Sequence, residues 1–239
     1  MTATVLITGA NRGIGRSVAA GFKAAGFTVV ATYRNDADKA PLAAEGLVPI
    51  ACDVSSSGSI NEAFDAAEAV VGPIGTVVAN AGITKDGLLM RLSDSDIDAV
   101  IETNLVGSIK IARRAVTSMI KQRYGRIIFV SSVVGLMGNA GQVNYAASKA
   151  GLVGAARSLA REVGSRGITV NVIAPGFVMT EMTAELPAEK QAEFLAQVPL
   201  KRFADPVEIA GTAVFLASEA AGYITGQVIG VDGGLGMGH

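Results

Sequence analysis

The chain has 239 residues, a formal net charge of −1, one histidine and a single cysteine, Cys52. One cysteine excludes an internal disulfide, and so few histidine and cysteine ligands argue against a zinc or other transition-metal centre. The basic residues are scattered along a nearly neutral chain, which argues against a nucleic-acid-binding surface. The length suits one large α/β domain, which we expect to span residues 1–239.

The N-terminus runs into an apolar strand within its first eight residues. It lacks the charged start, the long apolar stretch and the cleavage site of a signal peptide. We therefore expect a cytoplasmic protein that neither spans nor binds a membrane.

Short apolar runs alternate with helical patterns along the whole chain. Strands are predicted at residues 5–8, 28–33, 47–52, 76–79, 126–130, 168–173 and 227–231. Helices are predicted at residues 16–26, 57–71, about 93–122, from 144 onward, 188–197 and about 205–218. Residues 135–141 read as a flexible glycine-rich loop, and the helix at 188–197 lies on a segment that could act as a lid. This alternation, without a Pro/Ser-rich linker, predicts one Rossmann-like doubly wound parallel sheet in a single α/β domain.

A glycine loop joins the first strand to the first helix. Its sequence is Gly9-Ala-Asn-Arg-Gly-Ile-Gly15. The whole chain has 29 glycines among 239 residues, about 12% against a typical share of ~7%. Glycines let the backbone approach a pyrophosphate, and the following helix offers it free N–H groups. We expect a dinucleotide to contact six residues of this loop: Gly9, Asn11, Arg12, Gly13, Ile14 and Gly15. A mere tight turn between strand and helix is the alternative.

Arg34 ends the second strand, where a site selective for NAD usually carries an acid. An arginine suits a 2′-phosphate instead, and Arg12 could add a second positive charge. These residues predict NADPH rather than NADH as the cofactor. The nearby Asp36 leaves the choice open, and two solvated arginines are the other interpretation.

Polar residues and glycines also follow the ends of the later strands. Asp53, followed by Val54, could accept a hydrogen bond from an adenine amino group, or could simply cap a turn. Asn80 and Gly82 stand just past the fourth strand. Ser131 and Ser132 follow the fifth, and period-two alternation turns them to opposite faces, so that at most one faces a substrate.

Tyr145 and Lys149 stand four residues apart on a predicted helix, so their side chains share one face. A cation at ~4 Å favours a phenolate by ~4 kcal/mol at an effective dielectric of ~20, before desolvation is counted. The pair could therefore bring the tyrosine pKa toward neutrality, although the spacing also occurs by chance. Asn104, inside the long helix that begins near residue 93, predicts a local kink there.

The chain resembles the short-chain dehydrogenase/reductase family over its whole length, because the family's motifs occur in it in the same order. The motifs that carry the resemblance are Thr8-Gly-x-x-x-Gly-x-Gly15, Asn80-Ala-Gly82, Asn104, Ser132, Tyr145-x-x-x-Lys149 and Pro175-Gly176. Many members carry asparagine where this chain has Ala79, which puts the detail of that strand end in doubt.

The resemblance implies a role for each motif. Tyr145 would protonate the carbonyl oxygen of the substrate, Ser132 would hydrogen-bond that oxygen, and Lys149 would hold the nicotinamide ribose and depress the tyrosine pKa. Asn104 would hold a water that connects Lys149 to solvent. Asp53, Val54 and Asn80 would hold the adenosine half of the dinucleotide, while Val178 and Thr180 would fix the nicotinamide carboxamide. Further cofactor contacts are implied for Gly82, Tyr145, Lys149, Pro175 and Gly176.

Within this family the chain looks most like the β-ketoacyl-acyl-carrier-protein reductases, which implies NADPH-dependent reduction of 3-oxoacyl-acyl carrier protein in fatty acid biosynthesis. Arg123 and Arg166 would receive the acidic carrier protein, supported by Lys121 and Arg126, or would be ordinary solvated charges. A homotetramer built through the two long helices is also implied. The small residues expected to permit that packing are Ala112, Ala115, Ala146, Gly151, Gly154 and Ala155.

Three other classes were weighed. A serine hydrolase lacks both a G-x-S-x-G elbow and a usable histidine, since His239 is the terminal residue. A non-catalytic NADPH-binding regulator would be expected to lose one of the four catalytic positions. A family reductase of another ketone, such as a polyketide or a small alcohol, remains open. Four methionines could line an adaptable substrate pocket or could be core filler: Met90, Met137, Met179 and Met182.

Overall fold

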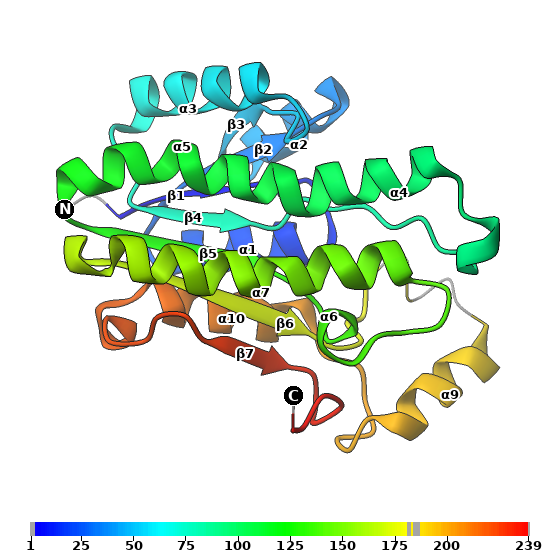
Figure 1. Ribbon diagram of the computed structural model, residues 1–239. Helices are drawn as coiled ribbons and strands as arrows, with labels where there is room; N and C mark the ends of the chain where they lie inside the picture. Colours follow the sequence, from blue (N-terminus) through cyan, green and yellow to red (C-terminus); the bar gives the residue numbers. More distant parts are fainter. Residues whose placement is uncertain (1–2, 181–182, 184–186, 239) are drawn as a thin grey trace.

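The computed structural model describes residues 3–180, 183 and 187–238. These residues contain a seven-stranded sheet in which each neighbouring pair is parallel, in the order β3-β2-β1-β4-β5-β6-β7 (Figure 1). The strands are β1 (Thr4–Ile7), β2 (Thr28–Tyr33), β3 (Val48–Ala51), β4 (Thr76–Ala79), β5 (Gly125–Val130), β6 (Ile168–Pro175) and β7 (Val228–Val231). The fold class predicted from the sequence, a Rossmann-like doubly wound sheet, is confirmed.

Helices cover both faces of the sheet. They are α1 (Gly13–Ala24), α2 (Lys39–Ala44), α3 (Ser57–Val71), α4 (Asp94–Ile101), α5 (Gly107–Gln122), α6 (Val134–Met137), α7 (Val143–Val163), α9 (Ala188–Gln197) and α10 (Pro206–Ala217). One apolar core lies between the sheet and α3, α5 and α7, and a second lies between the sheet and α1, α2 and α10. Figure 1 shows α5 and α7 side by side in front of the sheet, with α1 and α10 behind it.

The strand order reverses between β1 and β4, where the chain crosses from one half of the sheet to the other. In open parallel sheets this switch point opens a crevice at the carboxyl ends of the strands, where ligands bind. The glycine loop follows β1, and Asn80 follows β4, so both stand at this point. The topology therefore places the predicted cofactor residues together.

The long helix predicted from about residue 93 to 122 is interrupted. A π-helical turn, Glu102–Val106, separates α4 from α5 and contains Asn104, so a local irregularity of the helix lies where the kink was expected. Gly107 follows the turn, and a Cβ added there would lie 2.7 Å from the Val54 carbonyl oxygen. The interrupted helix therefore packs closely against the segment that follows β3.

Two segments differ from expectation. Helix α2 was not predicted, because Leu42 is its one buried side chain and leaves no apolar period to recognise. Residues 135–141 were expected to form a flexible loop, but the segment begins with α6. A Cβ at Gly135 would lie 2.8 Å from the Lys149 backbone, so this glycine lets α6 pack on α7 rather than loosening a loop.

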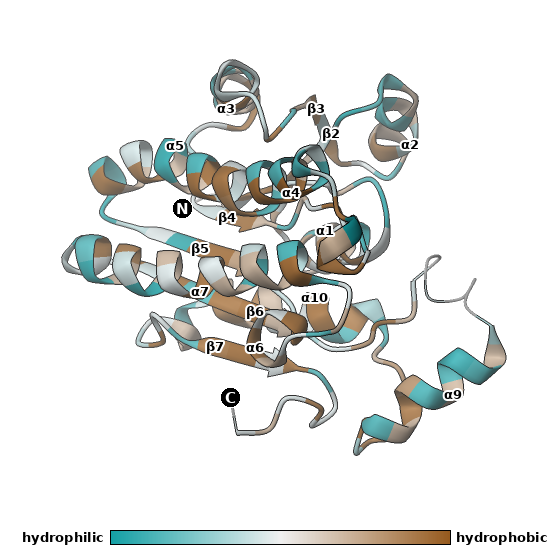
Figure 2. Cartoon of the chain, turned by 45° about the vertical axis from the view of Figure 1, so that its right-hand side comes forward, coloured by the Kyte–Doolittle hydropathy of each residue, from teal (hydrophilic) through white to brown (hydrophobic). Residues whose placement is uncertain are grey.

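The predicted helix at residues 188–197 is α9, in which no residue is buried. Figure 2 shows that it is largely hydrophilic and stands apart from the sheet. Phe194 stacks on Phe177 at a ring-centroid distance of 4.5 Å. Its role as a lid stays a prediction, and Met182 lies outside the described residues.

Candidate active site

The glycine loop is shaped by close backbone contacts. A Cβ added at Gly15 would lie 2.2 Å from the Gly9 carbonyl oxygen, and one at Gly9 would lie 3.0 Å from the Ala81 Cα. Gly9 and Gly13 also have positive φ angles of 64° and 53°. Because α1 begins at Gly13, its first N–H groups face the loop, which suits a pyrophosphate.

Asn80 and Thr8 brace this loop. The Asn80 Nδ2 donates to the carbonyl oxygens of Thr8 at 3.0 Å and Gly9 at 3.2 Å. The Thr8 hydroxyl oxygen accepts from the backbone N–H groups of Asn80 and Ala81, both at 3.0 Å. The side chain of Asn80, expected to hold adenosine, therefore shapes the glycine loop. The family motif contains Thr8 without indicating this role. The sequence signal for it is a hydroxyl side chain directly before the glycine loop.

The residues predicted at the adenosine end lie at the ends of β2 and β3. The Asp53 Oδ1 accepts hydrogen bonds from the Ser55 N–H at 2.9 Å and the Ser55 hydroxyl at 2.7 Å. These bonds, followed by the positive charge of Arg34, hold the pKa of Asp53 below its usual range. The turn role weighed for Asp53 is thus present. Val54 beside it is buried, and Arg34 is exposed.

The loop's remaining side chains point outward or brace its surroundings. Arg12 is exposed on extended backbone before α1. The Asn11 Nδ2 donates to the Asp38 carboxylate at 3.1 Å. Ile14 packs against the core behind the sheet, and Asp36 is exposed in a short turn after Arg34. Two cations, Arg12 and Arg34, are therefore available at the surface near the β2 end.

Tyr145 and Lys149 lie on α7 beside the end of β5. Lys149 is 4% exposed, its Nζ donates to the Val130 carbonyl oxygen at 2.8 Å, and it lies 5.6 Å from the centre of the Tyr145 ring. The predicted pairing of the two side chains on one helix face is present. The ammonium group is directed at the end of the strand, however, rather than at the phenol.

The expected lowering of the Tyr145 pKa is wrong for this structure. Burial raises the pKa of Tyr145, a hydrogen bond with Ser132 lowers it in part, and the charge of Asp86 raises it further. Burial also lowers the pKa of Lys149 to about 8. The sequence argument counted the attraction between the two groups and left out desolvation, which dominates here.

The two serines after β5 make different contacts with α7, and their expected opposite directions stay a prediction. The Ser131 hydroxyl donates to the Lys149 carbonyl oxygen at 2.8 Å and fastens β5 to α7. Ser132 is the serine that reaches Tyr145. The structure therefore assigns Ser131 to packing and brings Ser132 to Tyr145.

Asn104 is fully buried, and both ends of its amide are used. Its Oδ1 accepts from the Ile83 N–H at 2.8 Å, while its Nδ2 donates to the Ile83 carbonyl at 2.9 Å and to the Ser148 hydroxyl at 3.1 Å. A Cβ added at Gly82 would lie 3.1 Å from the Asn104 Oδ1 and 3.5 Å from the Lys149 Nζ. Gly82 thus permits these two side chains to come together. The water-holding role of Asn104 stays a prediction.

The segment after β6 reaches the same edge. The Pro175 carbonyl accepts from the Val133 N–H at 2.8 Å, and a Cβ at Gly176 would lie 2.7 Å from the Asp232 Cα. Val178 is buried. Thr180 lies next to the glycine loop, because a Cβ added at Gly13 would lie 3.8 Å from the Thr180 methyl group. The residues predicted at the nicotinamide end therefore adjoin the glycine loop.

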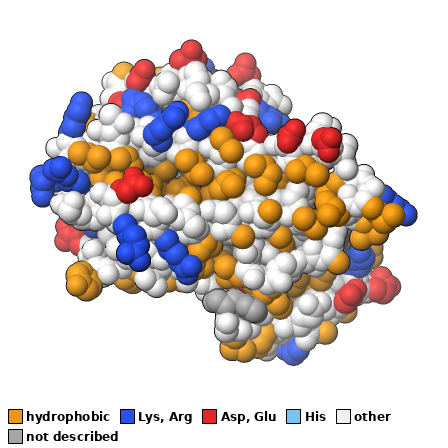
Figure 3. All heavy atoms as spheres, in the orientation of Figure 1, with side chains coloured by type: hydrophobic (Ala, Val, Ile, Leu, Met, Phe, Trp, Pro, Cys, Tyr) orange, Lys and Arg blue, Asp and Glu red, His pale blue; other side chains and the backbone are white. Residues whose placement is uncertain are grey.

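The predicted docking arginines lie elsewhere. Arg123 ends α5 and Arg166 precedes β6, so both stand at the amino end of the sheet, on the left in Figure 1. Basic side chains gather at that end in Figure 3. Arg126, expected to add to this surface, is 5% exposed, and its guanidinium lies 4.6 Å from the centre of the Tyr124 ring. It is part of the interior and offers no charge to a partner.

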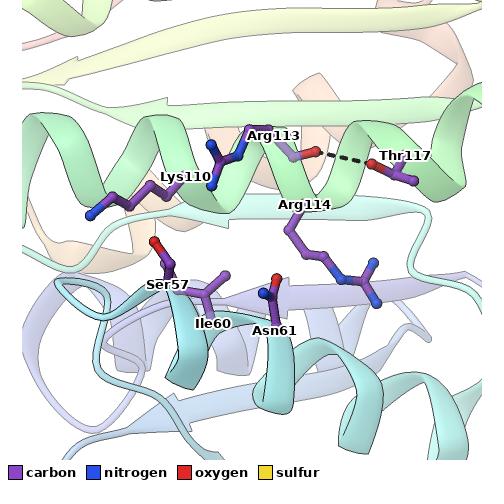
Figure 4. Close-up of a pocket in the computed structure, with 7 residues that line it drawn as sticks. All are labelled: Ser57, Ile60, Asn61, Lys110, Arg113, Arg114 and Thr117. Carbon is purple, nitrogen blue, oxygen red and sulfur yellow. Dashed lines mark hydrogen bonds between the residues drawn. The ribbon is translucent and has the colours of Figure 1, made fainter.

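Two surface hollows lie away from the catalytic side chains. One, of about 240 Å³, lies between α3 and α5 and is lined in part by Lys110, Arg113 and Arg114 (Figure 4). Two of these cations are paired, Lys110 with Glu102 at 2.6 Å and Arg114 with Asp65 and Glu68. The other, of about 430 Å³, lies between the end of β7 and the segment that follows α9. Neither is lined by Tyr145, Lys149 or Ser132.

Among residues 3–180, 183 and 187–238, no helix is long and apolar enough to cross a membrane. The same residues contain no group of three or more His, Cys, Asp or Glu side chains that could hold a metal ion.

Lys149→Met should stabilise the fold at pH 7 and less so at high pH. Below pH 8 the lysine is protonated in both states, so burial of its charge costs stability. Between pH 8 and 10.5 the folded lysine loses its proton first, so the native protein gains stability as pH rises. The shift from 10.5 to about 8 corresponds to about 3 kcal/mol, from which the orphaned Val130 carbonyl subtracts. Urea unfolding of both proteins at pH 7 and pH 10 measures the difference, and a difference independent of pH would contradict the prediction.

Comparison with known proteins gives a consistent result. Residues 9–236 match the family described as enoyl-(acyl carrier protein) reductase. The 3-oxoacyl-[acyl-carrier-protein] reductase MabA of Mycobacterium tuberculosis is 46% identical over 236 residues, covering 99% of this chain and 94% of the relative. The 3-oxoacyl-[acyl-carrier-protein] reductase FabG of Salmonella typhimurium is 47% identical, covering 97% of this chain and 96% of the relative. FabG of Staphylococcus epidermidis is 43% identical, covering 99% of this chain and 100% of the relative. With the glycine loop and the Ser132, Tyr145 and Lys149 cluster in place, the chain belongs to the short-chain dehydrogenase/reductase family.

Proposed function

We propose that this chain reduces 3-oxoacyl-acyl carrier protein to the 3-hydroxyacyl form with NADPH, in fatty acid biosynthesis, as one domain spanning residues 1–239. The observation that carries the proposal is the meeting of Ser132, Tyr145 and Lys149 at the same sheet edge as the glycine loop. The relatives named as 3-oxoacyl-[acyl-carrier-protein] reductases support the choice of substrate. As an enzyme of that pathway it would act in the cytoplasm.

The residues of the chain divide the chemistry among them. NADPH, when bound, supplies the hydride that reduces the ketone carbon. Tyr145 keeps its proton at neutral pH because its pKa is raised, so it is loaded as the donor to the carbonyl oxygen. Ser132 would hydrogen-bond the same oxygen and fix its position. The Lys149 ammonium, held by the Val130 carbonyl, would bind the ribose and stabilise the tyrosinate after proton transfer.

Following NADPH absorbance with four compounds tests the reaction: acetoacetyl thioester, crotonyl thioester, a sugar ketone and a steroid ketone. We expect rapid turnover of acetoacetyl thioester alone. The crotonyl compound matters because the matching family is described as an enoyl reductase. Turnover of crotonyl thioester, or of a sugar or steroid ketone in preference, would overturn the proposed substrate.

Arg34→Ala should reduce the preference for NADPH. Arg34 is exposed near Asp53, where it could pair with a 2′-phosphate. A lost charge-assisted hydrogen bond costs about 1.5–3 kcal/mol, or roughly 10- to 100-fold in NADPH affinity. Fluorescence titration should show weaker NADPH binding and unchanged NADH binding. Arg113→Ala, which removes another exposed arginine, is the matched control. Equal affinity for the two cofactors in the wild-type protein would refute the assignment.

We also propose that carrier docking at Arg123 and Arg166 requires self-association as a homotetramer. β5 has six residues, about 17 Å at ~3.3 Å per residue, and separates these arginines from the catalytic edge. In a two-fold pair through α5 and α7 the helices would run antiparallel, bringing a partner copy's arginines toward this edge. Figure 3 shows a hydrophobic band across this face. On the two helices, Ile109 of α5 and Val143 of α7 are half-exposed.

Four of the six small residues expected at that interface divide into two groups. Ala112 and Ala115 are buried against the sheet, and a Cβ at Gly151 would lie 2.8 Å from Leu105, so these three serve internal packing. Gly154 has no atom within 4 Å of an added Cβ and could face a partner. Helix α5 is rotated so that Ala112 and Ala115 face the sheet, and the sequence did not reveal this rotation. Light scattering that shows a monomer at working concentration would contradict the tetramer.

Arg123→Glu combined with Arg166→Glu should impair only the carrier-bound substrate. Replacing two positive charges repels an acidic partner, and we expect kcat/KM for 3-oxoacyl-acyl carrier protein to fall about tenfold or more. Turnover of free acetoacetyl thioester should stay the same, which controls for folding. An equal effect on both substrates, or no effect on either, would place docking elsewhere.

A further inference from the structure

Both backbone polar groups of Tyr145 are held by neighbouring side chains. Its N–H donates to the Asn144 Oδ1 at 2.8 Å, and its carbonyl accepts from the Ser148 hydroxyl at 2.7 Å. Tyr145 lies in the first turn of α7, where N–H groups have no partner within the helix. The Asn144 side chain therefore supplies a bond that the helix itself cannot.

The same side chains reach a short segment, residues 83–85, which we call the strap. The Asn144 Nδ2 donates to the Lys85 carbonyl at 3.1 Å. Asn104 joins the Ile83 N–H and carbonyl to the Ser148 hydroxyl. Asn144 is 3% exposed and Asn104 and Ser148 are fully buried, so these bonds form in a site with little water. The strap is thus tied to either side of Tyr145.

At its other end the strap joins the segment that follows β4. It follows Gly82 directly, and Asn80 just before that glycine braces the carbonyls of Thr8 and Gly9. A line of covalent and hydrogen bonds therefore runs from the glycine loop through the strap to the peptide groups of Tyr145. An outer link adds to it, because the Gln142 Nε2 donates to the Asp86 carboxylate at 3.0 Å.

We propose that Asn144 is a positioning residue that fixes Tyr145 relative to the bound cofactor by joining the Tyr145 N–H to the Lys85 carbonyl. The inference rests on the proposed reductase function. A residue needed only to cap the helix would use its oxygen alone, since a cap satisfies N–H groups. Asn144 also uses its amide N–H₂ group, across to the strap, and an asparagine is suited to donate and accept in this way.

This difference separates the two roles by experiment. Asn144→Asp keeps the acceptor for Tyr145 and places a favourable negative charge at the helix start, but cannot donate to Lys85. Asn144→Ala loses both bonds, and Asn144→Ser keeps a neutral acceptor on a shorter side chain. Gln142→Ala is the matched control, because it removes the outer link and a bond from the Asn139 Nδ2 but leaves both bonds of Asn144 in place. The full-length proteins are compared for kcat and KM with acetoacetyl thioester across pH, for NADPH affinity by fluorescence, and for thermal unfolding.

We expect the plateau kcat of the Ala, Asp and Ser variants to fall at least tenfold, because a displacement near 1 Å can cost 10²-fold in rate. NADPH affinity should stay within threefold of wild type, and Gln142→Ala should stay within threefold in every measurement. Taking the plateau of the pH profile separates loss of position from the charge of the aspartate, which moves the midpoint. An aspartate variant with a plateau kcat near wild type would overturn the proposal and leave helix capping. So would losses in kcat matched by equal losses in NADPH affinity.

Failure of the proposed function would be visible separately, as a wild-type protein that reduces no acyl thioester. Amide hydrogen exchange then tests the positioning role without turnover. Exchange at Lys85 and its neighbours should quicken in Asn144→Asp and Asn144→Ala but not in Gln142→Ala. Equal protection of the strap in all four proteins would contradict the link.

Discussion

Tyr145→Phe should lower kcat for acetoacetyl thioester by a factor of about 10²–10⁴, the range that general acid catalysis contributes. The substitution removes one hydroxyl and keeps the ring, so the packing of the ring should persist. Ser132 and Lys149 would remain in place, yet neither can replace the lost donor. The Ser132 hydroxyl is a far weaker acid, and the Lys149 ammonium is directed at the Val130 carbonyl.

Steady-state kinetics with NADPH in excess measure this effect. NADPH affinity should fall by less than threefold, because Tyr145→Phe removes at most one cofactor contact and leaves that of Lys149 in place. Tyr223→Phe is the control, since Tyr223 is fully exposed after α10 and should lose no activity. If Tyr145→Phe kept more than a tenth of the wild-type kcat, the proton donor would have to be another group.

Gly15→Ala should abolish cofactor binding. The added methyl would lie 2.2 Å from the Gly9 carbonyl oxygen and 2.6 Å from the Asn80 Nδ2, and the nearest obstacle is backbone that cannot turn aside. The loop must open, which removes the bond from Asn80 and spreads the N–H groups facing the pyrophosphate. Overpacking of this kind costs about 1–3 kcal/mol of stability. We expect NADPH affinity to fall at least 100-fold.

Fluorescence titration and thermal unfolding together test this result. Gly58→Ala is the matched control, because its Cβ would meet only the Ser56 hydroxyl at 3.8 Å in the first turn of α3. That change should leave NADPH binding intact and stabilise the helix slightly, by roughly 0.5–1 kcal/mol. NADPH affinity within tenfold of wild type in Gly15→Ala would show that the loop does not hold the pyrophosphate.

The sequence determined the strands and the order of the chemical groups. Parallel strands buried on both faces read as short apolar runs, so all seven were visible, and polar residues after each strand marked one edge of the sheet. The shared helix face of Tyr145 and Lys149 followed from helix geometry. The helix irregularity at Asn104 was foreseen because asparagine is out of place within an apolar helix. All these features depend on residues close together in the chain.

Only the tertiary structure decided the properties that depend on distant neighbours. Burial of Tyr145 raises its pKa, which the neighbouring charge of Lys149 was expected to lower. Arg126 was expected at the surface beside Arg123, but it belongs to β5 and its side chain is buried. The second use of the Asn144 amide needs Lys85, which is 59 positions away. Desolvation, helix rotation and long-range hydrogen bonds depend on packing among distant segments, and neither residue type nor spacing records that packing.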